Sequence, residues 1–322
     1  MSRLDRRAAP ITAGVIALLC ALPPFLSSSW LLVMFLSFVW LVITANYDVL
    51  DGFLGHVNLG QGAFFGLGAY VATILLNVPS VQQLGALAPL LVTACALVVA
   101  ALFAAVMAFP LFRLKGLYFA IGTLILIFLL QVLALNLTTL TGGSYGLYIP
   151  PSFFMSTFVG YYLALFLAAV SVGLNAYLSR SRLGLAFRCI KEDEAAAGSI
   201  GLDLMKYKTA ALVVASLPTA AAGVLFALNS GFIDPGIALG VERSLLPPLM
   251  ALLGGTGTAL GPVFGTAIIR ALETVFFHYL RLPVPSALFF GLTLLAVALL
   301  IPEGLLRSPR VKRLRAFRVL AS

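Results

Sequence analysis

The sequence predicts an all-α polytopic membrane protein with about ten transmembrane helices (8–10) in two repeat-like halves. Of its 322 residues, 61% are hydrophobic and 10% are charged, whereas soluble domains carry about a quarter charged residues. Mean hydropathy is +1.09. Ten spans of about twenty residues would need roughly 200 residues, which agrees with the apolar fraction. The Lys and Arg residues gather at the N-terminus, at 113–115, in 179–208 and after 306, a pattern typical of loops on the cytoplasmic side of a membrane.

The first half of the chain is expected to hold six apolar segments. The first follows Arg3, Arg6 and Arg7, and fits either an uncleaved span or a cleaved signal peptide. The third is short and rich in glycine, so it is either a span or a re-entrant segment. An uncharged loop at 136–151 separates the fifth segment from the sixth. The segments lie at about 11–26, 30–47, 51–78, 86–109, 117–135 and 158–178.

A charged island at 179–208 follows the sixth span. It holds six of the twenty Lys and Arg residues and four of the eleven acids, which places it on the cytoplasmic side. Arg188–Ser199 is rich in Ala, Glu and Lys, which favours a short surface helix, and Gly198 and Gly201 are expected to end it. Such a helix, held against the membrane between two spans, is interpreted as a docking surface.

Four more apolar segments are expected after the island, at about 209–228, 245–253, 261–279 and 285–301. Pro218 is expected to kink the first of them, and the second is short enough to be re-entrant. A loop at 229–245 with Asp234, Glu242 and Arg243 separates these two. Ten crossings would put both termini on the cytoplasmic side. The expected organisation is a single domain over 1–322, with a basic tail at 305–322.

Two glycine-rich passages echo each other. Gly55–Gly60 leads to Phe65-Gly66, and Gly257–Gly261 leads to Phe264-Gly265. Paired interrupted segments in the two halves of a chain are typical of an internal repeat with a solute path near its interface. Glycines four residues apart also allow close helix packing, so packing alone and packing beside a broken helix both remain open. The glycines assigned to helix packing are Gly62, Gly66, Gly257, Gly261 and Gly265.

No residue is predicted to be catalytic. The chain has no Gly-Lys-Ser or Gly-Lys-Thr, so it lacks the loop that binds ATP in P-loop proteins. His56 and His278 have no second ligand at metal spacing, and the three cysteines are far apart, so no metal site is expected. Arg270 and Glu273 are three residues apart on an expected helix and are predicted to pair. The cations form no stripe of the kind that binds nucleic acid.

Five motifs carry a resemblance to a known family. They are GHVNLGQGAFFGLGAY at 55–70, RLKGLYFAIGTL at 113–124, LTGGSYGLYIP at 140–150, SRLGLAFRCIKEDEAAAGSIGLDLMKYK at 181–208 and IPEG at 301–304. In this order they resemble bacterial branched-chain amino acid ABC transporter permeases, most of all the M-type subunit of leucine/isoleucine/valine importers. The similarity covers roughly residues 40 to 305.

The resemblance implies that the island is a coupling helix lying in a groove of an ATPase subunit. Glu194-Ala195-Ala196 matches the core of the importer signature, although the following glycine comes one residue later than in the general pattern. The residues expected to couple to the ATPase are Arg188, Lys191, Glu192, Asp193, Glu194, Ala195, Ala196 and Gly201.

The resemblance further implies ATP-driven import of Leu, Ile and Val across the bacterial inner membrane. Expected partners are a second permease subunit, two ATPases that bind ATP and Mg, and a periplasmic solute-binding protein that touches the loops 136–151 and 229–245. The chain itself is expected to bind no cofactor. Sparse polar groups would line the solute path, with His56 and Asn58 departing from the residues usual in the family. The path candidates are His56, Asn58, Gln61, Thr141 and Ser144.

Two alternatives remain open at this level. A permease of the same family could carry urea, short amides or other amino acids, which changes the cargo and not the mechanism. An ion-coupled secondary carrier would need ionisable residues deep in its spans, and the chain has few of them.

Overall fold

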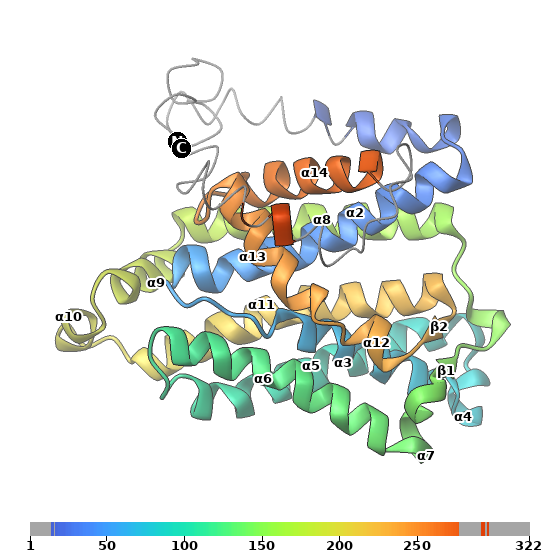
Figure 1. The fold of residues 1–322 in the computed structure, drawn as a ribbon, viewed down its shortest axis with the longest axis horizontal. Coiled ribbons are helices and arrows are strands. Elements are labelled where there is room, and N and C mark those ends of the chain that lie inside the picture. The colour runs from blue at the N-terminus through green and yellow to red at the C-terminus, as the bar shows by residue number, and fades with distance from the viewer. Residues whose placement is uncertain (1–13, 16, 277–290, 294, 296–322) are drawn as a thin grey trace.

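The computed structural model describes residues 14–15, 17–276, 291–293 and 295. The start of the expected first span, the end of the ninth, most of the tenth, the basic tail and both termini lie outside these residues. Within them the long helices run side by side along one direction (Figure 1). The chain therefore forms the helical membrane-type architecture that its composition predicts.

The elements alternate long apolar helices with short connecting ones. The helices are α2 (Ser28–Asp48), α3 (Gln61–Leu76), α4 (Pro79–Gln82), α5 (Ala88–Leu111), α6 (Leu117–Asn136), α7 (Thr138–Thr141), α8 (Thr157–Arg180), α9 (Arg182–Glu192), α10 (Glu194–Ser199), α11 (Leu204–Ser230), α12 (Pro235–Ala238), α13 (Glu242–Gly254) and α14 (Gly261–Thr274). A π-helical segment, η2 (Val49–Phe53), extends α2, and short 3-10 turns are η1 (Pro23–Phe25), η3 (Gly85–Leu87), η4 (Gly143–Tyr145) and η5 (Pro151–Phe153). The strands β1 (Leu147–Tyr148) and β2 (Phe232–Ile233) pair antiparallel, Leu147 opposite Ile233.

Among the described residues, six segments are long and apolar enough to cross a membrane. They are Ser28–Phe53, Gly85–Leu111, Leu117–Asn136, Thr157–Arg180, Leu204–Ser230 and Pro235–Gly254. The third expected segment is a shorter apolar helix, Gln61–Leu76. The observed boundaries differ from the expected ones mostly by a few residues, and α11 continues through Pro218.

Small residues form the interior of this fold. Along α5 the buried positions recur every fourth residue and are mostly alanine, at 88, 96, 100, 104 and 108. Leu90, Leu102 and Phe109 of the same helix are exposed. Small side chains let helices approach closely, while large ones face the lipid, because burial between helices brings no hydrophobic gain inside a bilayer.

Helices α3 and α11 cross at their glycines. A methyl group placed on Gly68 would lie 2.0 Å from the Ala220 carbonyl oxygen, and one on Gly223 would lie 2.0 Å from the Phe65 carbonyl oxygen. Neither position has room for a side chain. The two backbones therefore touch, with each glycine set against the facing helix.

Two expected elements are corrected. The single helix expected at Arg188–Ser199 is two helices, α9 and α10, because Asp193 is extended (φ −157°) and its carboxylate accepts hydrogen bonds from the Ala195 and Ala196 amides as an N-cap. The loop expected at 229–245 is largely helical, since α12 begins after Asp234, whose carboxylate caps it, and α13 begins at Glu242.

The molecule has two ends. Helices α9 and α10 project at one end, and β1, β2, α4 and α7 lie at the other (Figure 1). We call these the α10 end and the β end.

Candidate coupling site at the α10 end

A break in the helical structure lies between α2 and α3. The chain leaves η2 at Phe53, runs through residues 54–60 without helical structure and re-enters a helix at Gln61. Gly55 has φ +78°, a backbone conformation that favours glycine. Of the two alternatives left open for the first glycine-rich passage, the one with a broken helix agrees with this structure.

The second glycine-rich passage touches the chain just before the first one. The Gly257 amide donates a hydrogen bond to Asp48 Oδ1 at 2.8 Å, and a methyl group on Gly52 would lie 2.4 Å from the Gly257 nitrogen. Two segments from opposite halves of the chain thus share one contact. The remaining packing glycines are also confined, because methyl groups on Gly62, Gly66, Gly261 and Gly265 would lie within 2.8 Å of Ile127, Leu239, Gly255 and Met250 respectively.

Lys191 fastens α9 to the break. Its Nζ donates to the Gly52 carbonyl oxygen at 2.8 Å and approaches the Asp51 carbonyl oxygen at 3.3 Å. Its stem lies over Gly55, where a methyl group would stand 2.8 Å from Lys191 Cγ. The Lys191 side chain, although exposed, therefore lies against its own chain.

Glu194 is the centre of a second contact between the island and the break. Its Oε1 lies 2.6 Å from Lys208 Nζ and 3.4 Å from His56 Nε2. Lys208 is buried at the start of α11, with 6% of its side chain exposed, whereas 40% of the Glu194 side chain is exposed. One carboxylate thus joins α10, α11 and the segment that precedes α3.

His56 is held by aromatic rings on its other sides. Phe112 and Phe119 meet it edge to face at centroid distances of 5.6 and 5.1 Å, and its Nδ1 lies 3.1 Å from the Leu54 carbonyl oxygen. Burial lowers the pKa of His56 below its usual value, because removal from water disfavours the charged ring. The His56 ring is neutral above this lowered pKa, so the Lys208 ammonium is the group that neutralises Glu194.

Asn58 and Gln61 fix the start of α3 to α11. The Asn58 amide donates to Gln61 Oε1 at 3.0 Å, and Gln61 Nε2 donates to Thr219 Oγ1 at 2.8 Å and to the Ala215 carbonyl oxygen at 3.0 Å. Both side chains are buried. In this conformation their polar atoms serve the contact between helices.

Thr141 and Ser144 lie apart from these residues, at the β end (Figure 1). The Thr141 hydroxyl donates to the Ala134 and Leu137 carbonyl oxygens, and Ser144 is exposed. The five residues expected to line a path are therefore not gathered at one place in this structure.

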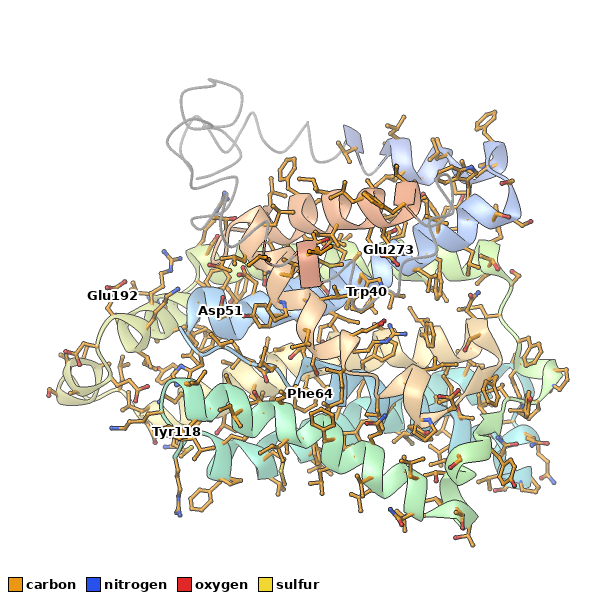
Figure 2. The ribbon with its side chains drawn as sticks, in the orientation of Figure 1. Trp40, Asp51, Phe64, Tyr118, Glu192 and Glu273 are labelled. Carbon is orange, nitrogen blue, oxygen red and sulfur yellow. The ribbon has the colours of Figure 1, made fainter. Side chains whose placement is uncertain are left out.

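The outer surface of the island is formed by the remaining predicted residues. Glu192 lies at the outer edge of α9 (Figure 2). Gly201, with φ +88°, has open space around its α-carbon. The predicted residues with exposed side chains on this surface are Arg188, Lys191, Glu192, Asp193, Ala195 and Ala196.

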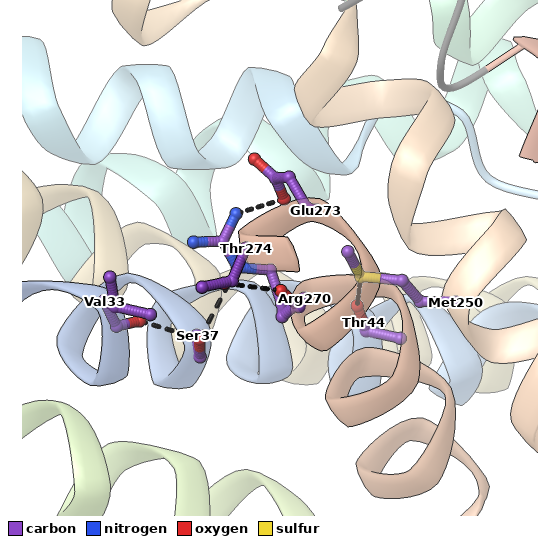
Figure 3. A network of polar contacts seen from close by, with 7 residues as sticks. All are labelled: Val33, Ser37, Thr44, Met250, Arg270, Glu273 and Thr274. Carbon is purple, nitrogen blue, oxygen red and sulfur yellow. Dashed lines mark hydrogen bonds and ion pairs between the residues drawn. The ribbon is translucent and has the colours of Figure 1, made fainter. Parts of the chain in front are cut away.

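A second polar contact lies inside the bundle. As the spacing predicted, the Arg270 guanidinium pairs with the Glu273 carboxylate, and its Nε lies 3.5 Å from Ser37 Oγ on α2 (Figure 3). Among the described residues, no group of three His, Cys, Asp or Glu side chains is placed to hold a metal ion.

Two important cations were missed by sequence reasoning. Lys208 was counted only as one charge of the island, and Arg243 was assigned to a loop. Arg243 instead lies inside the bundle over the rings of Trp40, Phe65 and Phe226. The three aromatic residues could not predict this site from the sequence, because they come from three different helices.

Comparison with known proteins agrees with this architecture. The family model described as "Branched-chain amino acid transport system / permease component" matches residues 29–298. The chain belongs to this family. No solved structure gives a significant match to the permease.

Curated relatives extend over most of the permease. It is 28% identical to the high-affinity branched-chain amino acid transport system permease protein LivM of Escherichia coli, over 85% of this chain and 69% of that protein. It is 25% identical to LivH of Salmonella typhimurium over 84% of this chain and 92% of that protein. A shorter match, 32% identical over 44% of this chain and 42% of that protein, is to the autoinducer 2 import system permease protein LsrC of Klebsiella pneumoniae.

Proposed function

We propose that this permease is the M-type membrane subunit of an ATP-driven importer that moves Leu, Ile and Val inward across the bacterial inner membrane. The family and the relatives with that printed name support the cargo. The observation that carries the mechanism is the Glu194 contact, which joins an exposed helix of the island to the broken segment before α3.

The α10 end is the cytoplasmic end in this proposal, since the cations of the island and of residues 113–115 lie there. A pair of ATPases that bind ATP and Mg grips the exposed surface of α9 and α10. Lys191 and Glu194 then pass the motion to Gly52 and His56, and so to the start of α3. A second permease subunit completes the membrane part.

The β end faces the periplasm in this proposal. A binding protein delivers the solute to the loops that carry β1 and β2, and the choice of solute rests mainly with that protein. The polar groups at the break and at Thr141 and Ser144 then belong to different stages of one path.

A same-family permease with another cargo is the second candidate, because the match to the autoinducer 2 importer subunit shows that related chains differ in cargo. An ion-coupled carrier is the candidate of another class. It predicts uptake that stops when ion gradients are collapsed and that needs no ATPase, whereas the importer needs both ATP and its ATPases.

The test uses the exposed alanine of the importer signature. Ala196→Arg places a long cation on the outer face of α10 without removing an internal contact, and the matched control is Ala86→Arg, an exposed alanine at the β end. Glu194 is unsuitable for this purpose, because replacing it also breaks the pair with Lys208.

We expect the wild type and Ala86→Arg to co-purify with two ATPases and to support ATP-dependent uptake of labelled leucine in vesicles supplied with binding protein. We expect Ala196→Arg to lose both, with an unchanged melting temperature. If ATPases bind and hydrolyse ATP but leucine, isoleucine and valine are not taken up, the cargo is wrong. If no ATPase binds the wild type, the proposal fails.

A further inference from the structure

Arg243 is a cation placed at the middle of the bundle. It lies in the candidate span Pro235–Gly254, and its guanidinium carbon is 4.2, 4.6 and 5.1 Å from the ring centroids of Phe65, Phe226 and Trp40. Trp40 shows how deep in the bundle Arg243 lies. This tryptophan is at the midpoint of the span Ser28–Phe53 and between the two ends of the molecule (Figure 2). The charge therefore sits where a membrane protein tolerates charge poorly.

The backbone around Arg243 fixes its position. A methyl group on Gly62 would lie 2.8 Å from Arg243 Cβ, so α3 and α13 are in direct contact there. The side chain nevertheless keeps part of its surface accessible. Its guanidinium is thus enclosed by three helices, and the residue as a whole is partly exposed.

Arg270 provides the comparison. Both arginines contact α2 near its middle, Arg270 at Ser37 and Arg243 at Trp40. Arg270 has a carboxylate partner, Glu273. For Arg243, the one hydrogen bond found within the described residues is a long one, from Nε to the Ile237 carbonyl oxygen at 3.4 Å.

Aromatic faces attract a guanidinium but are only weak hydrogen-bond acceptors. Within the described part of the chain, Nη1 and Nη2 of Arg243 have no hydrogen-bond partner. They form a planar fork of donors, the geometry that binds a carboxylate through two parallel hydrogen bonds. Glu242, the preceding residue, interacts favourably with the charge of Arg243. A buried cation in this condition still favours a further anion, because the anion supplies acceptors for the fork.

We infer that Arg243 binds the carboxylate of the transported solute as it crosses the permease. This deepens the proposed function and rests on it for the identity of the solute. The rings of Trp40, Phe65 and Phe226 hold the guanidinium when no solute is present. The arriving carboxylate draws it from the rings, and its departure lets it return.

The experiment uses Trp40 as the reporter. The chain has two tryptophans, so the Trp30→Phe variant of the full chain, placed in lipid nanodiscs, leaves Trp40 as the only one. Three probes are titrated while its fluorescence is recorded: leucine, 4-methylpentanoate, which lacks the ammonium group, and leucinol, which lacks the carboxylate. The matched control is Arg113→Gln, which removes an arginine that also stacks on a ring, Phe109, but at the 113–115 turn.

We expect leucine and 4-methylpentanoate to change the Trp40 emission saturably and leucinol to have no effect. Arg243→Gln should abolish both responses and Arg113→Gln should preserve them. Arg243→Lys keeps the charge without the fork, and should bind the carboxylates about ten-fold more weakly. If Arg243→Gln has a lowered melting temperature, Arg243→Lys replaces it in the comparison with Arg113→Gln.

An equal response to leucinol, a response retained in Arg243→Gln, or no response of the parent chain to either carboxylate would overturn the assignment. ATP-dependent uptake of leucine by the assembled importer is measured in parallel. A Trp40 response without uptake would reject the proposed function and keep the site. Uptake without a Trp40 response would support the proposed function and reject the Arg243 site.

Discussion

The ion pair between Glu194 and Lys208 has two unequal partners. Lys208 is almost fully buried, whereas Glu194 is partly exposed to solvent. If the lysine is removed, water can still solvate the carboxylate. If the carboxylate is removed, a buried ammonium loses its partner, and this is the costlier of the two changes.

We therefore expect Glu194→Gln to lower the free energy of unfolding by about 3 kcal/mol and Lys208→Met by about 1 kcal/mol or less. The double variant should be more stable than Glu194→Gln alone, because it leaves no unpaired charge. Denaturant unfolding of the purified chain measures all three. Equal losses for the two single variants would show that the burial of Lys208 does not decide the energy.

His56 makes the stability of the α10 end depend on pH. Its pKa is lowered in the folded chain by burial, so between its ordinary and its lowered pKa the unfolded state binds more protons. The contribution of His56 to stability is then complete above the ordinary pKa of about 6.5 and is lost as the pH falls through the lowered value.

We expect the melting temperature of the wild type to fall more steeply between about pH 7.5 and pH 5 than that of His56→Gln, which cannot titrate. The two curves should run parallel above about pH 7.5, where both side chains are neutral. A steeper acid loss in His56→Gln would mean that the Glu194 contact, and not burial, controls the titration of this ring.

Single residues were predictable from the sequence only where their partners are close along the chain. The pair of Arg270 and Glu273 followed from a spacing of three residues on a helix. The partners of Lys208 and Arg243 come from other helices, and no local pattern marks such a contact. For the same reason the contacts of Glu194 with Lys208 and His56 were not predicted.

At the scale of helices, the crossing of α3 and α11 depends on glycine. Gly223 on α11 and Gly173 on α8 are both glycines inside helices, but a methyl group on Gly223 would meet the backbone of α3, whereas one on Gly173 has nothing within 4 Å. An alanine at each position therefore separates the effect of packing from the effect of helix propensity.

We expect Gly223→Ala to destabilise the fold by about 1–3 kcal/mol, because the two backbones must separate. Gly173→Ala should be neutral or should stabilise by up to about 1 kcal/mol, because alanine favours a helix over glycine. Unfolding of the two variants under identical conditions gives the comparison. A neutral Gly223→Ala would indicate that α3 and α11 shift apart without cost.

Hydropathy predicted the helices better than it predicted their interruptions. The long spans begin and end close to where the apolar runs do, because each run is long enough to cross a bilayer. The break after Asp193 was missed, since the helix propensities of Ala, Glu and Lys hold on both sides of it. It depends on one carboxylate that caps the second helix. The first residues of α13, before Leu245, were assigned to a loop, because the charged residues Glu242 and Arg243 are typical of loops.

For the molecule as a whole, the order of motifs along the chain was enough to predict the family, and the family model then matched residues 29–298. The count of about ten spans depends on segments that the structure does not describe. The echo of the two glycine-rich passages did not predict the contact of Gly257 with Gly52, three residues before the first passage, because sequence similarity between two segments does not say that they touch.

The small ladder of β1 and β2 joins the loop after α6 to the loop after α11. Asn77, just beyond the last turn of α3, donates its amide to the Tyr148 carbonyl oxygen at 2.9 Å, so the ladder is also fastened to that helix. The first turn of α3, 16 residues away, follows His56 and its carboxylate contact. Under the proposed function, a protein that pulls on either outer loop moves both loops and α3 together. Docking of the binding protein at the β end would then be transmitted to the ATPase end through α3. The same helix would transmit the movement driven by ATP in the opposite direction.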